Sequence, residues 1–265
     1  MRETLDTQQL TSLKILIIGE SCKDEYRLGS VKRISPEAPV PIINYSSSFS
    51  VEGMAANVKK NVESFCGNNS ITLLTNTDII IKRRFIDNKS NQQLLREDIN
   101  DSVAHLTEEQ LEIINNNDFD AVIISDYCKG LISPEAAKII CEKFKYKVYV
   151  DSKKEDLSCF PFSIIKINEE EDNQSYNLPI TATKIVTLGS EGSFCEGVHS
   201  KPKSVQVHDV TGAGDVFLAA LAIFNTYKSI HDSIDLANKL ASYSVEHFGT
   251  YVITKTDIER ALNET

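Results

Sequence analysis

Short apolar runs rich in β-branched residues alternate with helix-like segments along most of this 265-residue chain. Such runs suit strands buried on both faces, and a helix between two of them suits a parallel crossover, so the alternation predicts an α/β fold with a mostly parallel central sheet. The predicted strands are Leu13–Ile18, Ile71–Leu74, Ala121–Ile124, Val148–Val150, Ile164–Ile167 and Lys184–Leu188. The predicted helices are Ala55–Phe65, Glu108–Ile114, Pro134–Phe144, Ala213–Phe224, Ser233–His247 and Thr256–Leu262.

Two segments interrupt this alternation. Residues 26–50 contain three prolines and then a serine cluster, which disfavours a helix and favours short edge strands with turns. Residues 79–99 have the pattern of two β-like runs around an Asn-Lys-Ser-Asn turn. We expect these segments to form a small sheet beside the main one, as insertions into a single domain that covers residues 1–265.

Charge and hydropathy exclude several classes of partner. A formal net charge of −10 repels polyanions, which argues against non-specific binding to nucleic acid or to an anionic membrane. Any phosphate site must therefore be formed by a few nearby groups and not by the overall charge of the protein. No apolar stretch reaches the length of a membrane span, and residues 1–14 lack the apolar core of a signal peptide, so we expect a cytoplasmic protein.

The six cysteines are scattered without a CxxC pair, and the five histidines show no HxxxH spacing. This distribution favours buried free thiols over a zinc site or a disulfide framework.

The stretch VHDVTGAGDVFLAALA, residues 207–222, joins a β-rich run to an apolar helix. In open α/β sheets, ligands bind beyond the carboxyl ends of strands, where helix N-termini present free amides. Gly212 and Gly214 let an anion approach the backbone, and Asp215 could take a proton from a hydroxyl while the amides stabilise a transferring phosphoryl group. Alternatively, Asp215 is a first-turn residue that favours the helix dipole, and the glycines only permit a tight turn.

Two further segments offer polar groups for a nucleotide. VTLGSEG places Thr187, Gly189 and Gly192 after a predicted strand, which suits a loop near a phosphate and equally a plain hairpin turn. KINEEE places Asn168 and Glu171 three residues apart, where they could orient a hydrated magnesium ion or a phosphate, or could begin an acidic helix. The chain has neither GxGxxG nor GxxxxGKS, which disfavours a Rossmann dinucleotide site and a P-loop.

Four separated motifs, in order, resemble the ribokinase or PfkB family of sugar kinases: ILIIGESCKDEY, EGMAANVKKN, DVTGAGD and DLANKLASYSVEHFGT. The resemblance implies a three-layer α/β/α sandwich with a small β lid, ATP and Mg²⁺ as cofactors, a monovalent cation as a further candidate, and a homodimer formed through the lid. It implies a base at Asp215 and anion-binding amides at Gly212, Ala213 and Gly214. It implies sugar contacts at Asp24, Gly53 and Asn57. It further implies a water-mediated magnesium ligand at Glu171 and nucleotide contacts at Asn168, Thr187, Gly189, Gly192 and Asn238.

Three segments, RISPEAPVPII, SNQQLLRED and ISDYCKG, are similar to a narrower branch of that family, the D-glycero-D-manno-heptose-7-phosphate kinases. This likeness implies phosphorylation of the anomeric hydroxyl of a heptose 7-phosphate, a step towards lipopolysaccharide heptose. Lys129 and Arg33 are then candidates to bind the phosphate of the substrate, although either could be a solvated charge.

The chain also departs from the family pattern. Met54 stands where the family has a second glycine beside the sugar, and the connection between ITLLTN and IIIKRRF is short, so the sheet could lack an edge unit. Nothing resembles the HxGH motif of a nucleotidyltransferase domain. Two alternatives stay open: a kinase for another sugar or sugar phosphate, and a non-catalytic sugar- or nucleotide-binding relative. The retention of Asp215 together with Asn168 and Glu171 argues against the second, because a pure binder needs no base.

Overall fold

The computed structural model describes residue 10, residues 12–247 and residues 249–264. The body of the molecule is built on an eight-stranded sheet in the order β12-β11-β10-β9-β8-β7-β1-β4. Neighbouring strands from β4 to β10 run parallel, whereas β11 and β12 are antiparallel to their neighbours. The strands are β1 (Ile15–Gly19), β4 (Ile71–Leu74), β7 (Ala121–Asp126), β8 (Val148–Ser152), β9 (Ser163–Asn168), β10 (Thr183–Thr187), β11 (Ser193–Cys195) and β12 (Val198–Ser200).

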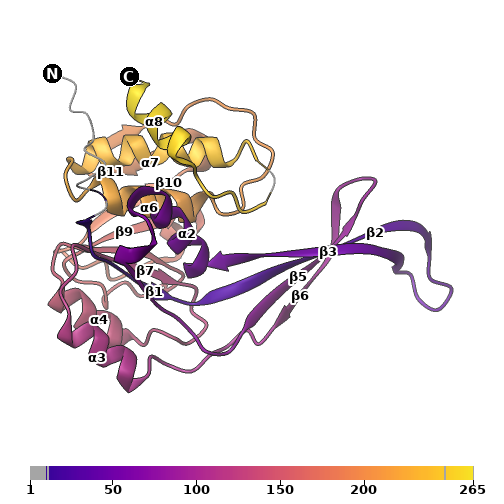
Figure 1. Ribbon diagram of the computed structural model, residues 1–265, viewed down its shortest axis with the longest axis horizontal. Coiled ribbons are helices and arrows are strands. Elements are labelled where there is room, and N and C mark those ends of the chain that lie inside the picture. Colours follow the sequence, from indigo (N-terminus) through magenta and orange to yellow (C-terminus); the bar gives the residue numbers. More distant parts are fainter. Residues whose placement is uncertain (1–9, 11, 248, 265) are drawn as a thin grey trace.

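Helices cover both faces of this sheet, which confirms the predicted three-layer sandwich (Figure 1). Ile15 and Ile17 of β1 belong to one core, and Leu16 and Ile18 belong to the other, so the strand is buried on both faces. The first core is closed by α2 (Ala55–Cys66), α6 (Ala213–Phe224), α7 (Ile230–Ser244) and α8 (Lys255–Asn263), and the second by α3 (Glu108–Asn116) and α4 (Pro134–Lys143). The short helix α5 (Glu169–Gln174) follows β9, and single 3-10 turns lie at Asn68–Ser70 and Gly189–Glu191.

Every predicted strand and helix is found, with ends that differ by a few residues. The largest difference is at α7, which begins at Ile230 because the Ser229 hydroxyl caps it by accepting a hydrogen bond from the Asp232 amide. At α8, Thr254 and Asp257 form a capping box, so this helix begins at Lys255. Caps depend on which hydroxyl reaches a free amide, and the periodicity of the chain does not contain that information.

All six cysteines are free thiols, as predicted. The expectation that they are all buried is wrong for Cys128, which is exposed. This residue lies in the loop after β7 with φ +55°, and its amide donates to Oδ1 of Asp126. The turn directs the side chain outward.

A second sheet of four strands, the lid sheet, projects from the body (Figure 1). It confirms the predicted small sheet. The strand order is β3-β2-β5-β6, with β2 (Ser21–Ile34), β3 (Pro41–Met54), β5 (Ile80–Asp87) and β6 (Gln92–Ile99). The strands therefore begin before, and end after, the predicted insertion at residues 26–50.

The prediction of short strands in that segment is wrong, because β2 and β3 have 14 residues each. Pro36 and Pro39 lie in the connection between the two strands, and Pro41 is the first residue of β3, where the ladder tolerates a missing amide. The serines face solvent on β3, which is an edge strand as predicted. The prolines therefore mark the one turn of a long hairpin that β2 and β3 form.

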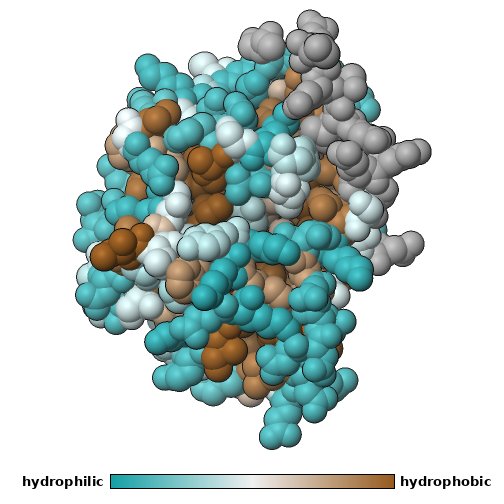
Figure 2. Space-filling view, turned by 90° about the vertical axis from the view of Figure 1, so that its left-hand side faces the viewer, coloured by the Kyte–Doolittle hydropathy of each residue, from teal (hydrophilic) through white to brown (hydrophobic). Residues whose placement is uncertain are grey.

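The lid sheet is a single layer and exposes large apolar side chains, among them Tyr45, Phe49 and Leu95 at 61%, 47% and 59% exposure. By contrast, the end of the body opposite the lid is mostly hydrophilic, with small separate hydrophobic groups (Figure 2). A sheet normally buries its apolar face against another layer. In the part of the chain that the structure describes, no helix has the length and apolarity needed to cross a bilayer.

Met54 has a backbone conformation that normally requires glycine. Its φ and ψ are 60° and −134°, and it is the N-cap of α2. The side chain is 3% exposed and packs against Cys22 and Ile80 at the base of the lid sheet. A non-glycine residue in such a region costs on the order of 1–3 kcal/mol and persists only when its surroundings hold it. The packing of the Met54 side chain at this junction therefore compensates for the strain in the Met54 backbone.

We expect Met54→Gly to be more stable than Met54→Ala by about 1 kcal/mol, because both lose the same packing and only alanine keeps a strained Cβ. Urea unfolding of the two variants measures the difference. Ala56→Gly is the matched control: Ala56 lies in the first turn of α2, and glycine should destabilise there by about 1 kcal/mol. Equal stability of the two Met54 variants would contradict the strain.

Candidate active site

The two glycines before α6 meet different constraints. Gly212 is the N-cap, with φ +83°, a left-handed conformation that glycine adopts without strain. Gly214 has no such φ, but a Cβ there would lie 2.9 Å from Nζ of Lys166. The first glycine serves the turn, and the second leaves room for an ammonium group.

Asp209 fixes this turn to the segment after α7. Its Oδ1 accepts hydrogen bonds from the amide and hydroxyl of Thr211 at 2.9 and 2.7 Å, and its Oδ2 accepts one from the Gly249 amide at 2.9 Å. Burial opposes ionisation of Asp209, but these hydrogen bonds outweigh it and lower the pKa of the carboxyl. The turn is held in place before any ligand binds.

Not all three amides proposed to bind an anion are free. The Ala213 amide donates to the carbonyl of Val210 at 3.2 Å. For the Gly212 and Gly214 amides, no hydrogen-bond partner occurs within residues 10–264 as far as the structure describes them. An anion at this turn would therefore be bound first by these two groups.

Asp215 is 5% exposed and meets polar groups from two other parts of the chain. Asn57, at the start of α2, donates from Nδ2 to Oδ2 of Asp215 at 2.7 Å, and Tyr127, after β7, donates from its hydroxyl to Oδ1 at 3.4 Å. Burial raises the pKa of Asp215 to about 6; the charge of Asp151 adds to the rise, while Asn57 and Lys166 oppose it. A carboxyl of this kind is ionised at neutral pH and can still accept a proton.

A cavity of about 570 Å³ opens beside the turn. Ends of β8, β9 and β10, the turn before α6 and part of α7 form its walls. The predicted site residues that line it are Asn168, Thr187, Gly189, Gly192, Gly212, Ala213, Gly214, Asp215 and Asn238. Its apolar wall includes Val205, Val207, Phe217, Ala241 and Val245. A pocket with an apolar wall and a few polar groups has the character of a small-molecule site.

The predicted nucleotide residues are held by neighbouring strands. Asn238 is buried, and its Nδ2 donates to the hydroxyls of Ser193 and Ser200 at 2.9 and 2.8 Å. Gly192 has φ +94°, and a Cβ there would collide with the carbonyl oxygen of Ser200. Thr187 donates to the carbonyl of Ile167 at 3.3 Å. The loop after β10 is therefore a turn into an antiparallel strand, as one alternative held, and it also lines the cavity; its contact with a phosphate stays a prediction.

The predicted sugar residues lie at the base of the lid sheet. Asp24 is 4% exposed, and its Oδ1 accepts a hydrogen bond from Arg84 of β5 at 2.9 Å. A Cβ at Gly53, on the paired strand β3, would collide with the Asp24 carboxylate. Gly53 is therefore needed for close packing around Asp24, and Asn57 links this region to Asp215.

Two predicted residues have other partners, and a third is exposed. Lys129 pairs with Asp101 at 2.6 Å. Glu171 forms a capping box with Asn168, its carboxylate accepts from the Asn168 amide at 2.8 Å, and it also pairs with Lys153. Arg33 is exposed near the turn that connects β2 and β3. The structure thus shows the acidic helix start that the sequence left open, and the proposed roles of Lys129 and Glu171 stay predictions.

The sequence interpretation missed several polar residues of this site: Tyr127, Asp151, Lys153 and Lys166 line the cavity. Asp151 and Lys166 lie in the adjacent strands β8 and β9 near their carboxyl ends. The rule that ligands bind at this edge of a parallel sheet could have identified both. The contact of Tyr127 with Asp215 could not be foreseen, because it depends on the path of the loop after β7.

Residues 76–257 match the pfkB family carbohydrate kinase profile. The chain belongs to this family. It is therefore a carbohydrate kinase, a phosphotransferase, as predicted.

Curated relatives resemble the chain over most of its length. The Bifunctional protein HldE of Sulfurimonas denitrificans is 30% identical over 303 aligned residues, which cover 93% of this chain and 63% of that protein. The chain thus spans less than two thirds of this relative. Because the alignment is longer than the 265-residue chain, the relative also has internal segments that the chain lacks. This agrees with the direct passage from β4, at the sheet edge, through residues 75–79 into β5.

Solved structures show the same fold at low identity. Ribokinase from Arabidopsis thaliana, complexed with ribose and ATP, superposes with a TM-score of 0.69 at 17% identity and covers 96% of this chain and 99% of its own. Phosphofructokinase-2 from Escherichia coli, in complex with potassium, gives a TM-score of 0.73 at 16% identity, with 94% and 98% covered. The chain has a ribokinase-like fold.

The polar groups of the cavity suit a magnesium ion that arrives with a nucleotide. Among the described residues, no group of three or more His, Cys, Asp or Glu side chains could hold a metal ion. Magnesium keeps several waters and is usually bound by one or two carboxylates together with substrate phosphates. Asp151 and Asp215 are the two carboxylates among the residues that line the cavity. The donor set fits such an ion.

We expect kcat/KM to fall as the pH drops below about 6, because Asp215 must be ionised to accept a proton. In Asn57→Ala the fall in kcat/KM should begin at a higher pH, because the lost hydrogen bond stabilises the ionised form of Asp215. Tyr127→Phe, which removes a longer hydrogen bond, should give a smaller shift in the same direction. Initial rates between pH 5 and 8 measure this pH dependence. An unchanged pH dependence in Asn57→Ala would contradict the assignment of the fall to Asp215.

Proposed function

We propose that this protein is an ATP-dependent kinase that transfers a phosphoryl group to a hydroxyl of a sugar phosphate. The observation that carries the proposal is the buried Asp215 carboxyl, with a pKa of about 6, beside a turn that lines a cavity. Asp215 takes the proton of the acceptor hydroxyl, and the Gly212 and Gly214 amides bind the transferring group. The catalytic unit is a single domain with the lid sheet as its insertion.

ATP fits the cavity with its adenine near Asn238 and the apolar wall, and its phosphates towards the turn before α6. Gly189 and Gly192 let the loop after β10 pass close to the nucleotide. Magnesium is held by the phosphates and by water, with Asn168 and Glu171 acting through water molecules. A monovalent cation is a further candidate, since one solved relative has potassium in its complex.

The acceptor lies between Asp215 and the base of the lid sheet. Asp24 and Asn57 orient its hydroxyls, because both lie where the lid sheet joins the body. Lys82 of β5 is placed to bind a phosphate of the acceptor: its Nζ is 5.0 Å from the Tyr127 ring centroid, and no carboxylate of the described chain lies within 4 Å of it. Lys82 therefore replaces Lys129, which pairs with Asp101, as our first candidate for phosphate binding.

The specific acceptor that we propose is D-glycero-D-manno-heptose 7-phosphate, giving the 1,7-bisphosphate. The likeness to HldE proteins and the three branch-like segments support this choice. At 30% identity, another sugar or sugar phosphate is the alternative, and Met54 is the residue that favours it, because it is buried at the base of the lid where the family has glycine.

We expect the heptose 7-phosphate to give the highest kcat/KM in a panel of phosphorylated and free sugars assayed by ADP release. Asp215→Asn should lower turnover of the best acceptor by about two to four orders of magnitude and leave ATP binding nearly unchanged. Lys82→Met should raise KM about tenfold for phosphorylated acceptors and should not affect free sugars.

Lys23 of β2, whose side chain points to the opposite face of the lid sheet from Asp24, gives the control variant Lys23→Met, which should behave as wild type. Tight sugar binding with no ADP release from any acceptor would contradict the kinase and favour a non-catalytic binder. Preference for a free sugar would contradict the phosphorylated acceptor alone.

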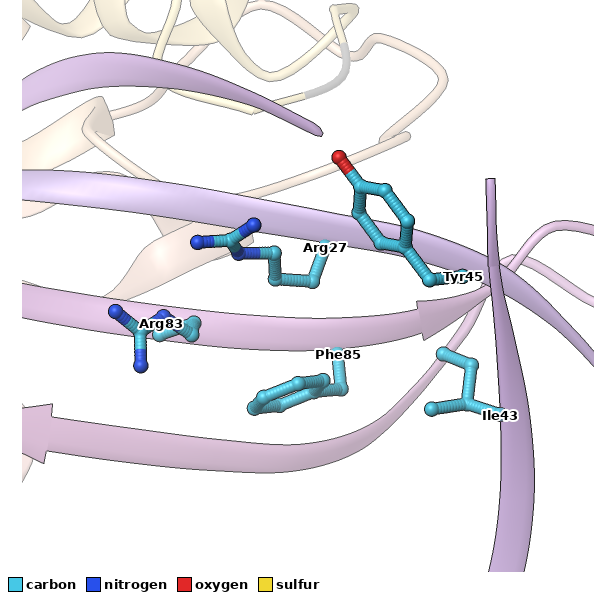
Figure 3. Close-up of a pocket in the computed structure, with 5 residues that line it drawn as sticks. All are labelled: Arg27, Ile43, Tyr45, Arg83 and Phe85. Atoms are coloured by element: carbon cyan, nitrogen blue, oxygen red, sulfur yellow. The ribbon is translucent and has the colours of Figure 1, made fainter. Parts of the chain in front are cut away.

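We further propose a homodimer in which the lid sheet of one copy covers that of the other. A hollow of about 290 Å³, lined by Arg27, Ile43, Tyr45, Arg83 and Phe85, lies on the face of the lid sheet turned away from Asp24 (Figure 3). Strand alternation places Arg27 and Asp24 on opposite faces. A second copy would bury these side chains, which no second layer of the described chain covers.

Leu95→Lys should weaken the dimer at least tenfold, because Leu95 is opposite Phe85 on the same face and is 59% exposed. Sedimentation equilibrium at micromolar concentration measures the dissociation constant. Ile139→Lys, at a residue of α4 that is 55% exposed, is the matched control and should leave the dimer intact. A wild-type monomer, or an unchanged dimer in Leu95→Lys, would contradict this interface.

A further inference from the structure

Lys166 is a buried cation in the wall of the cavity. It lies in β9, is 5% exposed, and donates from Nζ to Oδ2 of Asp151 at 2.7 Å. Asp151 lies in the neighbouring strand β8 and lines the same cavity. Burying an ammonium group is costly unless a carboxylate pairs with it, so Asp151 explains how the charge is tolerated. It does not explain why the charge is at this place.

The position of Lys166 is defined by the turn before α6. The ammonium group lies 2.9 Å from where a Cβ of Gly214 would be, so it is packed against the backbone of the turn that lines the cavity. It is also near Asp215: burial raises the pKa of that carboxyl, and the charge of Lys166 opposes the rise. By contrast, Lys184 of β10 pairs with Asp172 at 2.6 Å and does not line the cavity.

We propose that Lys166 contacts the terminal phosphate of ATP and stabilises its charge during transfer; this inference rests on the proposed ATP-dependent function. The transferred phosphorus must approach a hydroxyl that Asp215 deprotonates, and Lys166 and the Gly214 backbone border that space. The terminal group spreads negative charge over its outer oxygens as it moves. A preorganised cation in a site of low dielectric stabilises that charge strongly.

The step balances without another reactant. The acceptor oxygen forms a bond to the terminal phosphorus, and the bond from that phosphorus to the bridging oxygen breaks, leaving ADP. The acceptor proton passes to Asp215, and Lys166 keeps its own protons throughout. Asp151 holds the ammonium group in place before the nucleotide arrives, so Asp151 is a positioning residue.

The test compares ATP with ADP, because only ATP carries the terminal phosphate. Lys166→Met should weaken ATP binding roughly 10- to 100-fold and change ADP binding less than about twofold, as measured by calorimetry with magnesium and without acceptor. With an accepted sugar, it should lower kcat by about 10²–10³. Since Lys166→Met leaves Asp151 buried and unpaired, the double variant Asp151→Asn with Lys166→Met should show the same contrast between ATP and ADP. The double variant covers the case in which the single one does not fold.

Lys184→Met is the matched control, because it removes an ion-paired lysine from the next strand, outside the cavity, and should bind both nucleotides as wild type does. Equal weakening of ATP and ADP, or no weakening of either, would overturn the role of Lys166. If wild type binds ATP but phosphorylates no sugar in the panel, the proposed acceptor is wrong, while the ATP and ADP comparison still decides on Lys166.

Discussion

The site depends on burying an ionisable carboxylate, that of Asp215. An isolated buried carboxylate would be too costly, so its oxygens need donors and a nearby cation. These come from three elements: Asn57 from α2, Tyr127 from the loop after β7, and Lys166 from β9. The parallel sheet brings the last two to the same edge as the turn before α6. The chemistry is therefore a consequence of strand order.

Glu20 connects two of these elements. It follows β1 and is fully buried, and its carboxylate accepts hydrogen bonds from the amides of Tyr127, Lys129 and Leu131 at 2.8, 3.1 and 3.1 Å. Its carbonyl oxygen accepts the amide of Ala55, the first residue of α2, at 2.9 Å. One residue thus fixes both the loop that carries Tyr127 and the start of the helix that carries Asn57. Since both side chains donate to Asp215, Glu20 aligns them without touching that carboxylate.

The sequence predicted the body of the fold well, because buried parallel strands and amphipathic helices leave a local pattern. It also identified the cavity residues that lie in glycine-rich turns, such as Gly192 and Gly212, because a turn with positive φ is visible in the sequence. It did not identify Glu20, because nothing local in the sequence separates a buried carboxylate from an exposed one at the end of a strand. It also missed Lys166, although this residue lies near the carboxyl end of β9, the edge at which ligands bind in a parallel sheet. The serine cluster pointed to short strands, but β3 is long, because an edge strand exposed to solvent permits serines.

The base of the lid sheet is held in place by side-chain hydrogen bonds. Ser21 of β2 exchanges hydrogen bonds with the side chain of Asn76, its amide donating to Oδ1 at 2.7 Å and its carbonyl accepting from Nδ2 at 3.1 Å. The Asn76 side chain thus makes the two hydrogen bonds that a neighbouring strand would make. It holds the short connection before β5 against the start of β2.

Asp24 and Arg84 lie beyond this fastening, on adjacent strands of one sheet, and their ion pair moves with the sheet. A sugar hydroxyl that binds Asp24 must therefore share its carboxylate with Arg84. Because both residues belong to one sheet, a movement of the sheet as a whole does not separate them.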